Sequence, residues 1–379
     1  MRYYFLLFIY LIAFTSCKKD KDNVKDDDVK ELKVLGWAQT TNNSNSIPSL
    51  WTESRQLDFL PILNNAHYKM YFSHKMNGKL IYVGIEDIHS PASSKIVMWK
   101  GSSKMILSEI ILSPVQQERI LGISVDPQSN GIFILASNLN NYYYYRITDG
   151  GNEIIKSSVN AGAHGIPVYI QANGTDINVL TITQVYSDQV TEGKTTIKHL
   201  KNDVVYATYD IPLNEEEYFW NNLIVGSAYI ENNVCHLLAA ADQSLDYYYL
   251  KLSKNDPIVQ RSFQTDNYTP AFGAETASIS SASGLYEDGR FYVAAKKSAR
   301  DVACLTIDVR PAVPTVVKST LEAPESNTTY TPTKVYKYDG DIYLSGLAND
   351  FGVYWKNGKL TVPDKSGLSM SRIGYIAYH

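Results

Sequence analysis

The chain has 379 residues, a net charge of −4, and a composition that is 44% hydrophobic and 20% charged. This apolar content supports a folded core and excludes a disordered or collagen-like chain. The slight acidic excess argues against a nucleic-acid partner, because binding phosphates requires clustered basic charge. The 29 tyrosines favour β-strands, where aromatic side chains pack well on a pleated surface.

Residues 1–16 are typical of a secretory signal peptide. A basic residue precedes an apolar run at 3–14, which is shorter than the roughly 20 residues that a membrane-spanning helix needs. The segment 14–17, Phe-Thr-Ser-Cys, resembles the lipobox of bacterial lipoproteins, and this resemblance implies cleavage before Cys17 and lipidation of its thiol. Phe14 stands where that family usually has leucine. An ordinary secretory signal is the alternative.

The segment behind the cysteine is strongly charged. Residues 18–30 contain five lysines, five aspartates and almost no apolar side chain, so we expect residues 17–30 to form a solvated, lipid-bearing tether. The acidic cluster resembles the surface-export signal of Bacteroidota-type lipoproteins, which implies an outer-membrane lipoprotein exposed on the cell surface. A plain spacer that faces the periplasm is the alternative. Several acyl chains would anchor the protein firmly, whereas one chain binds a membrane only marginally.

The remaining residues, 31–379, form a repeat. Seven short alternating apolar runs recur at intervals of 45–58 residues, and each unit divides into four such runs separated by turn residues. This pattern predicts one all-β domain, a seven-bladed β-propeller with four-stranded antiparallel blades. Asn-Gly at 357–358, between two apolar runs, is the strongest of the hairpin signals. No run has a sustained helical period, so helices should be scarce.

The two ends of the repeat complement one another. The first unit, residues 32–63, contains three strand-like runs and has no room for an innermost one, whereas residues 371–379 form one spare strand after the seventh unit. We expect this C-terminal strand to complete the first blade. Such closure removes the open sheet edges that would otherwise invite aggregation.

An aromatic residue recurs near the end of the third strand of several units, and we interpret these residues as packing between blades. They are Trp51, Trp99, Tyr145, Tyr249 and Trp355. The segments 98–101 and 355–358, which carry Trp-Lys close to a glycine, resemble blades of uncharacterised Bacteroidota lipoproteins. That resemblance covers the mature chain and implies no activity. The signatures of kelch, tryptophan-aspartate and sialidase repeats are absent from the sequence.

The chain carries none of the short motifs of zinc proteases, serine hydrolases, P-loop proteins or dinucleotide-binding enzymes, so we predict no cofactor and no metal. The acidic run at 215–217 and the segment 126–131 are interpreted as turns. The seven histidines lack the spacing of metal ligands and are expected to be structural or exposed. Cys235 and Cys304 lie in apolar runs and should be buried free thiols.

The candidate site is the propeller face built from the loops between second and third strands. These loops are rich in Asn, Asp, Ser and Tyr, which suit hydrogen bonding to hydroxyls and stacking on sugar or peptide groups. The same residues are also common turn formers. The candidate ligand-binding residues are Glu86, Asp87, His89, Asn138, Tyr142, Tyr186, Asp188, Asp242, Asp246, Lys296, Arg300 and Asp350.

Two functions fit this site. The first is non-catalytic binding of a glycan, a peptide or a partner lipoprotein through the loop face. The alternative is a secreted carbohydrate-active enzyme, a polysaccharide lyase or glycoside hydrolase, that uses acidic loop residues as catalysts. Hydrolysis would need two carboxylates about 5–10 Å apart. No motif pairs the carboxylates in the sequence, so binding is the favoured hypothesis and no catalytic residue is assigned.

Overall fold

The structure is a computed structural model, and it describes residues 31–378 with several gaps. The residues left out within this range are 42, 53–54, 61–65, 90–91, 102, 108–115, 139–140, 163, 185–194, 212–222, 242–246 and 273–283. The predicted signal peptide, Cys17 and the tether therefore lie outside the described residues. In the part that is described, no helix is long and apolar enough to cross a membrane.

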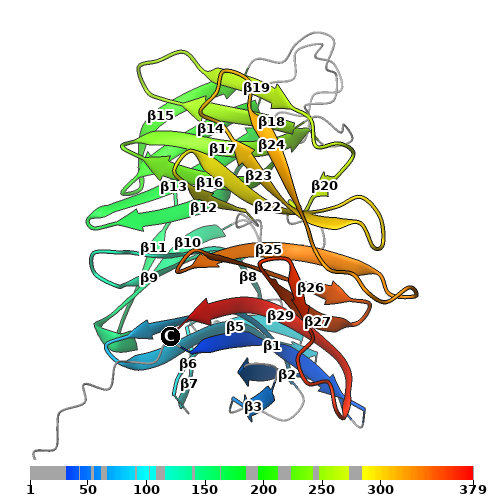
Figure 1. The fold of residues 1–379 in the computed structure, drawn as a ribbon. Coiled ribbons are helices and arrows are strands. Elements are labelled where there is room, and N and C mark those ends of the chain that lie inside the picture. Colours follow the sequence, from blue (N-terminus) through cyan, green and yellow to red (C-terminus); the bar gives the residue numbers. More distant parts are fainter. Residues whose placement is uncertain are drawn as a thin grey trace, which may run out of the picture.

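The described strands form a ring of seven antiparallel blades, as predicted (Figure 1). In blades one to four, the four strands follow one another from the centre of the ring outward. Blade one is β29 (Leu368–Tyr378), β1 (Leu32–Thr40), β2 (Asn43–Thr52) and β3 (Arg55–Phe59); blade two is β4 (Ala66–Met76), β5 (Lys79–His89), β6 (Ala92–Lys100) and β7 (Ser103–Ile106); blade three is β8 (Gln116–Val125), β9 (Ile132–Asn138), β10 (Asn141–Thr148) and β11 (Glu153–Ser158); blade four is β12 (Gly165–Asn173), β13 (Asp176–Gln184), β14 (Thr195–Lys201) and β15 (Val204–Ile211).

Blades five to seven follow the same order, and blade six has its innermost position divided between two strands. Blade five is β16 (Leu223–Glu231), β17 (Val234–Ala241), β18 (Tyr247–Leu252) and β19 (Val259–Phe263); blade six is β20 (Thr269–Pro270) with β21 (Leu285–Glu287), then β22 (Arg290–Lys296), β23 (Val302–Asp308) and β24 (Thr315–Thr320); blade seven is β25 (Tyr330–Tyr338), β26 (Asp341–Ala348), β27 (Phe351–Lys356) and β28 (Lys359–Thr361). A short 3-10 segment, Asp149–Gly151, lies between β10 and β11.

The ring closes through its C-terminal strand, which confirms the prediction from the chain ends. Strand β29 pairs antiparallel with β1 from Leu32↔Tyr378 to Thr40↔Leu368, and Figure 1 shows the two strands side by side. Tyr338 on blade seven donates a hydrogen bond from its hydroxyl to the carbonyl of Ile376 on β29 (2.6 Å). Part of the tyrosine excess therefore stabilises the closure.

Close approach of inner strands also explains a glycine in β29. A Cβ atom at Gly374 would lie 1.7 Å from the carbonyl oxygen of Met70 on the innermost strand of blade two. Real Cβ atoms do not approach backbone so closely, so only glycine allows β29 to pack against β4 in this way.

The apolar side chains of the described residues form seven separate clusters, and each cluster lies between two neighbouring blades. The cluster between blades seven and one, which contains Trp51 and Ile376, completes the circle. Trp99 and Trp355 are fully buried in the clusters between blades one and two and between blades six and seven. The predicted inter-blade role of the repeated aromatics is therefore confirmed.

Both cysteines of the propeller are buried and free, as predicted. Cys235 packs between blades four and five, and Cys304 packs between blades six and seven. Burial raises the pKa of each thiol to about 12, so both are held in the protonated, unreactive form.

The predicted hairpin turns have the expected backbone. Asn357 and Gly358 have φ angles of 48° and 84°, and the turns at 77–78 and 339–340 repeat this pattern of two positive values. A two-residue turn of this kind matches the right-handed twist of the strands that it joins, and it favours Asn or Asp followed by Gly.

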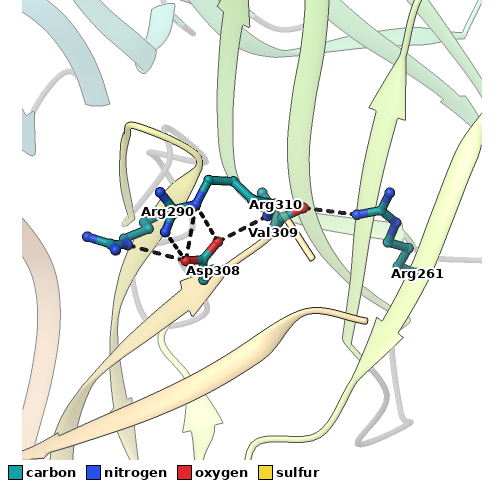
Figure 2. A network of polar contacts seen from close by, with 5 residues as sticks. All are labelled: Arg261, Arg290, Asp308, Val309 and Arg310. Atoms are coloured by element: carbon teal, nitrogen blue, oxygen red, sulfur yellow. Dashed lines mark hydrogen bonds and ion pairs between the residues drawn. The ribbon is translucent and has the colours of Figure 1, made fainter. Parts of the chain in front are cut away.

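Polar contacts connect blades on the side of the ring that carries these short turns. Figure 2 shows Asp308, which accepts hydrogen bonds from Arg290 (3.4 Å) and from the backbone and side chain of Arg310. Arg261 of blade five donates to the carbonyl of Val309 in blade six (2.9 Å). Arg261 therefore joins blade five to blade six, and pairing with Arg310 lowers the pKa of the Asp308 carboxyl within blade six.

Two features of the ring were not predicted from the sequence. Strands β6 and β8 pair in parallel at Ser93↔Gln116 and Ser94↔Gln117, which joins blades two and three into one sheet. In blade six, β20 and β21 both pair with β22, so the innermost strand is interrupted by a segment of the chain that is largely outside the described residues.

Candidate ligand-binding site

A cavity of about 1260 Å³ occupies the centre of the ring, and the innermost strands of all seven blades contribute to its wall. We refer to this cavity as the central channel. It is larger than the 300–1,000 Å³ that is usual for small-molecule pockets, so it has room for several sugar rings or a short peptide. The described part of the channel wall is built mainly from strands rather than loops.

The channel is lined by more positive than negative side chains. Among the described residues that line it, six are Lys or Arg and two are Asp or Glu, although the whole protein has a net charge of −4. Positive charges inside a low-dielectric cavity attract anions more strongly than the same charges on an open surface. The cationic residues are Lys69, Arg119, Lys296, Lys334, Lys337 and Arg372; the acidic ones are Asp87 and Glu118.

The two channel carboxylates are already engaged. Asp87 forms an ion pair with Lys69 (3.1 Å) and accepts a hydrogen bond from the hydroxyl of Ser94 (2.6 Å). Glu118 is 1% exposed, and it accepts hydrogen bonds from the hydroxyl of Tyr143 and from the backbone N–H of Ile96 (3.1 Å). Glu118 therefore links the innermost strand of blade three to the third strand of blade two, close to the parallel β6–β8 pair.

The cations differ in how they are held. Lys337 is ion-paired with Glu287, and Arg372 donates from Nη1 to the carbonyl of Asp350 (2.7 Å). Arg119 is exposed toward the channel. Lys334 has two aromatic rings beside its ammonium group, and no carboxylate of the described residues pairs with it.

Aromatic rings cover much of the remaining wall. Tyr229 of blade five and Tyr286 of blade six stack with their centroids 4.8 Å apart and their planes 25° from parallel. His236 also stacks on Tyr286, at 5.1 Å and 28°, which makes a short column of nearly parallel rings. Tyr229 is at the end of this column, lines the channel and is half-buried, so it can offer a ring face and a hydroxyl to a ligand.

The buried histidines are structural in the described part of the chain. Burial lowers the pKa of both His199 and His236 to about 4, so both are neutral at pH 7. His199 hydrogen-bonds to Asn178 (2.7 Å), and His236 hydrogen-bonds to Tyr249 (2.8 Å). Within the described ranges, no three His, Cys, Asp or Glu side chains lie close enough together to hold a metal ion.

Two of the sequence-predicted site residues, Asp87 and Lys296, lie in the channel wall. Glu86 does not, because neighbouring residues of a strand point to opposite faces. Its side chain is 1% exposed, and it pairs inside blade two with Lys104 and with the hydroxyl of Tyr68 (2.6 Å).

Four other predicted residues lie away from the channel wall. Tyr142 is half-buried against the cluster between blades three and four, and burial raises the pKa of its hydroxyl. Asn138 ends β9 with a buried side-chain oxygen that has no hydrogen-bond partner among the described residues. Arg300 is exposed and donates to the carbonyl of Ala323. Asp350 is exposed, and its backbone carbonyl holds Arg372.

The remaining predicted residues cannot be placed in the site. The side chain of His89 is outside the described residues, although its backbone belongs to β5. The other four residues lie entirely outside the described residues: Tyr186, Asp188, Asp242 and Asp246. Their proposed contribution to ligand binding stays a prediction.

Most of the channel wall was not predicted from the sequence, because the site was expected in loops. The missed residues belong to innermost strands: Arg119, Tyr229, Tyr286, Lys334, Tyr336, Tyr375 and Arg372. One signal was present in β25, where lysines and tyrosines share a single strand at 334–338. A lysine in the middle of an innermost propeller strand faces either the channel or a blade core, and a core would not accept it unpaired.

Comparison with known proteins identifies the fold and no family. No model of a known protein family matches the chain, and no protein of curated function matches it either. The chain is similar in structure to a puromycin hydrolase mutant complexed with PGG, with 7% identity and a TM-score of 0.53 over 90% of this chain and 53% of that one. At this identity the likeness shows the propeller fold alone.

Two further similar structures come from Pyrococcus species. The acylaminoacyl peptidase of Pyrococcus horikoshii is 9% identical and has a TM-score of 0.47, over 77% of this chain and 45% of that one. The β-propeller domain of the Trilobed protease from Pyrococcus furiosus is also 9% identical, with a TM-score of 0.45 over 80% of this chain and 84% of that domain. This chain thus spans about half the length of the two hydrolytic enzymes and most of the isolated propeller domain.

Proposed function

We propose that this protein is a membrane-anchored, extracytoplasmic β-propeller that binds an acidic glycan in its central channel without catalysing a reaction on it. The observation that carries the proposal is the cationic lining of a channel of about 1260 Å³ in a protein whose net charge is −4. An anionic ligand gains from this local field, while the acidic exterior adds no general attraction for polyanions.

The aromatic wall supports a glycan as the anionic ligand. Sugar rings have apolar C–H faces that pack on aromatic rings, and their hydroxyls form hydrogen bonds with tyrosine hydroxyls and with serine or threonine. Tyr229 offers such a ring face on one wall, and Thr331 offers a hydroxyl on the wall of blade seven. A glycan with carboxylated sugars would use both kinds of wall and the positive charge together.

The state of the two channel carboxylates supports binding rather than hydrolysis. A glycoside hydrolase needs one carboxyl group that donates a proton and another that acts as base or nucleophile. Asp87 is held by Lys69 and Ser94, and Glu118 is buried behind hydrogen bonds to neighbouring strands. In these positions, neither carboxyl group serves as the proton donor or as the base or nucleophile that hydrolysis requires.

The N-terminal residues support the membrane location. Lipidation of Cys17 would anchor the chain, and residues 17–30 would span up to about 50 Å when extended. That reach holds the propeller clear of the lipid surface, so a polymeric ligand could enter the channel. Exposure on the cell surface, with orientation toward the periplasm as the second choice, follows from the resemblance of the acidic cluster to an export signal.

The mature lipoprotein, solubilised in detergent, can be tested by titration calorimetry against an oligogalacturonate, the neutral galactose oligomer of equal length, and an acidic peptide. We expect binding of the oligogalacturonate alone, with an affinity that falls as salt concentration rises. Equal binding of the neutral oligomer, or preferred binding of the peptide, would overturn the proposed ligand class. Shortened oligosaccharides in the same samples would overturn the non-catalytic assignment.

A further inference from the structure

Lys334 is the channel cation whose surroundings are most unusual. It lies on β25, the innermost strand of blade seven, directly after a β-bulge between Pro332 and Lys334. Its ammonium nitrogen lies 5.6 Å from the ring centroid of Tyr336 and 5.7 Å from that of Tyr375 on the neighbouring strand β29. These distances are those of cation–π contacts, so two rings flank the charge.

No anionic partner accompanies this charge among the described residues. Several other lysines of the fold are paired, including Lys69 with Asp87 and Lys337 with Glu287 in the channel itself. The described residues give the ammonium group of Lys334 neither an ion pair nor a hydrogen bond, so its three N–H groups have no protein acceptor there.

A half-buried, unpaired ammonium group is costly. Transfer of a charge out of water is unfavourable unless an opposite charge or hydrogen-bond acceptors replace the lost hydration. The effect is visible in the acid–base behaviour, because burial lowers the pKa of Lys334 from 10.5 to about 8. A ligand that brought a carboxylate to this position would supply the missing counter-charge and acceptors.

We propose that Lys334, together with the rings of Tyr336 and Tyr375, is the subsite that binds the carboxylate of an acidic sugar in the channel. This inference rests on the proposed function and adds the group of the ligand that is recognised and the residues that recognise it. The two rings lie within cation–π distance of the ammonium group, and Lys334 itself lines the channel. A carboxylate accepts charge-assisted hydrogen bonds from an ammonium group, which are stronger than those between neutral groups.

The two phenols beside the ammonium group keep the same charge between pH 7 and pH 10. Burial raises the pKa of Tyr375 to about 12 and raises that of Tyr336 further, so both phenols stay neutral. Carboxylate binding that depends on Lys334 should therefore weaken as pH rises above 8, because the lysine then loses its proton.

The first test measures the lysine directly and needs no high-affinity ligand. The mature lipoprotein in detergent is labelled with a trace of acetic anhydride, and the acetylation of each lysine is followed by mass spectrometry. Galacturonate, a pyranose with one carboxylate, should slow the acetylation of Lys334, whereas galactose at equal concentration should not. Lys356, which is ion-paired with Asp341 on an outer strand of the same blade, is the internal control and should be unaffected by either sugar.

The second test measures affinity. Lys334→Met should weaken oligogalacturonate binding by about tenfold to a hundredfold, which is the effect of losing a hydrogen-bonded contact to a charged group. Lys356→Met removes one charge from the same blade outside the channel wall and should leave the affinity unchanged. Circular dichroism and a thermal melt of both variants would show that the fold is retained.

The outcomes separate this inference from the proposed function. Oligogalacturonate binding by the wild type without protection of Lys334 and without an effect of Lys334→Met would overturn the subsite and leave the function in place. Protection of Lys334 by galacturonate without binding of any oligosaccharide would support the subsite and overturn the function. Equal protection by galactose would show that the carboxylate is not recognised and would also overturn the subsite.

Discussion

Replacement of Lys334 by methionine should make the protein more stable, although the same change weakens ligand binding. The variant removes a half-buried, unpaired charge and keeps most of the aliphatic side chain between Tyr336 and Tyr375. A residue that costs stability in the free protein and improves binding is the expected signature of a site that is organised for its ligand.

The magnitude follows from the shift in the pKa. The pKa of Lys334 falls from 10.5 in the unfolded chain to about 8 in the folded one. One pKa unit corresponds to about 1.4 kcal/mol, so the protonated lysine costs about 3 kcal/mol at pH 7 and about 1 kcal/mol at pH 10. Two cation–π contacts, each worth roughly 0.5–1 kcal/mol, offset part of this cost. The expected net gain for Lys334→Met at pH 7 is therefore about 1–3 kcal/mol.

The assay is urea unfolding of wild type and variant at pH 7 and pH 10. The unfolded chain binds the proton of Lys334 more tightly than the folded one, so the free energy of unfolding of the wild type should rise with pH between 8 and 10.5 relative to the variant. The stability gained by the variant should accordingly shrink by about 2 kcal/mol at pH 10. An advantage of equal size at both pH values would refute this reasoning, because it would come from packing rather than from charge.

Three further predictions concern other parts of the chain. Gly374→Ala should destabilise the ring by about 3 kcal/mol or more, because the added Cβ meets the carbonyl of Met70, and a thermal melt would reveal it. Asp308→Asn should cost roughly 0.5–1 kcal/mol above pH 4. Since Arg310 lowers the pKa of that carboxyl, this difference should largely persist at pH 3 and fade only as the pH falls toward the lowered pKa, which urea titrations at pH 7, pH 3 and pH 2 would measure. Cys17→Ala should move the protein from the membrane fraction to the soluble fraction after cell lysis, and continued membrane association would contradict the lipoprotein assignment.

The architecture could be predicted because its signals are local. Asn-Gly at 357–358 and Asp-Gly at 339–340 specify hairpin turns through their positive φ angles, and the alternation of apolar residues between such turns specifies strands. Counting these units gave seven blades, and the missing strand of the first unit pointed to the C-terminal segment that pairs with β1. Each step used only residues close together in the chain, apart from the final closure.

The site could not be predicted in the same way. Period-two alternation assigns the residues of an innermost strand to two faces, but it does not show which face meets the channel. A β-bulge changes this assignment further. The innermost strands of five blades each carry a register irregularity at an equivalent place, in blades two, three, four, five and seven. In blade seven the irregularity lies just before Lys334. A bulge increases the local twist and redirects the following side chains, and no alternation rule reveals it.

The sequence alone determined the strands, the number of blades, the way the ring closes and the N-terminal segments that we expect to anchor the chain. These properties follow from turn chemistry, hydrophobic period and composition, all of which act over a few residues. The tertiary structure decided which charges are paired and which face the channel. Lys69 and Lys337 form ion pairs with carboxylates on neighbouring strands. The ammonium group of Lys334 instead lies beside two tyrosine rings, one of them on β29. That difference arises when distant strands are brought together around one axis, so only the closed ring reveals it.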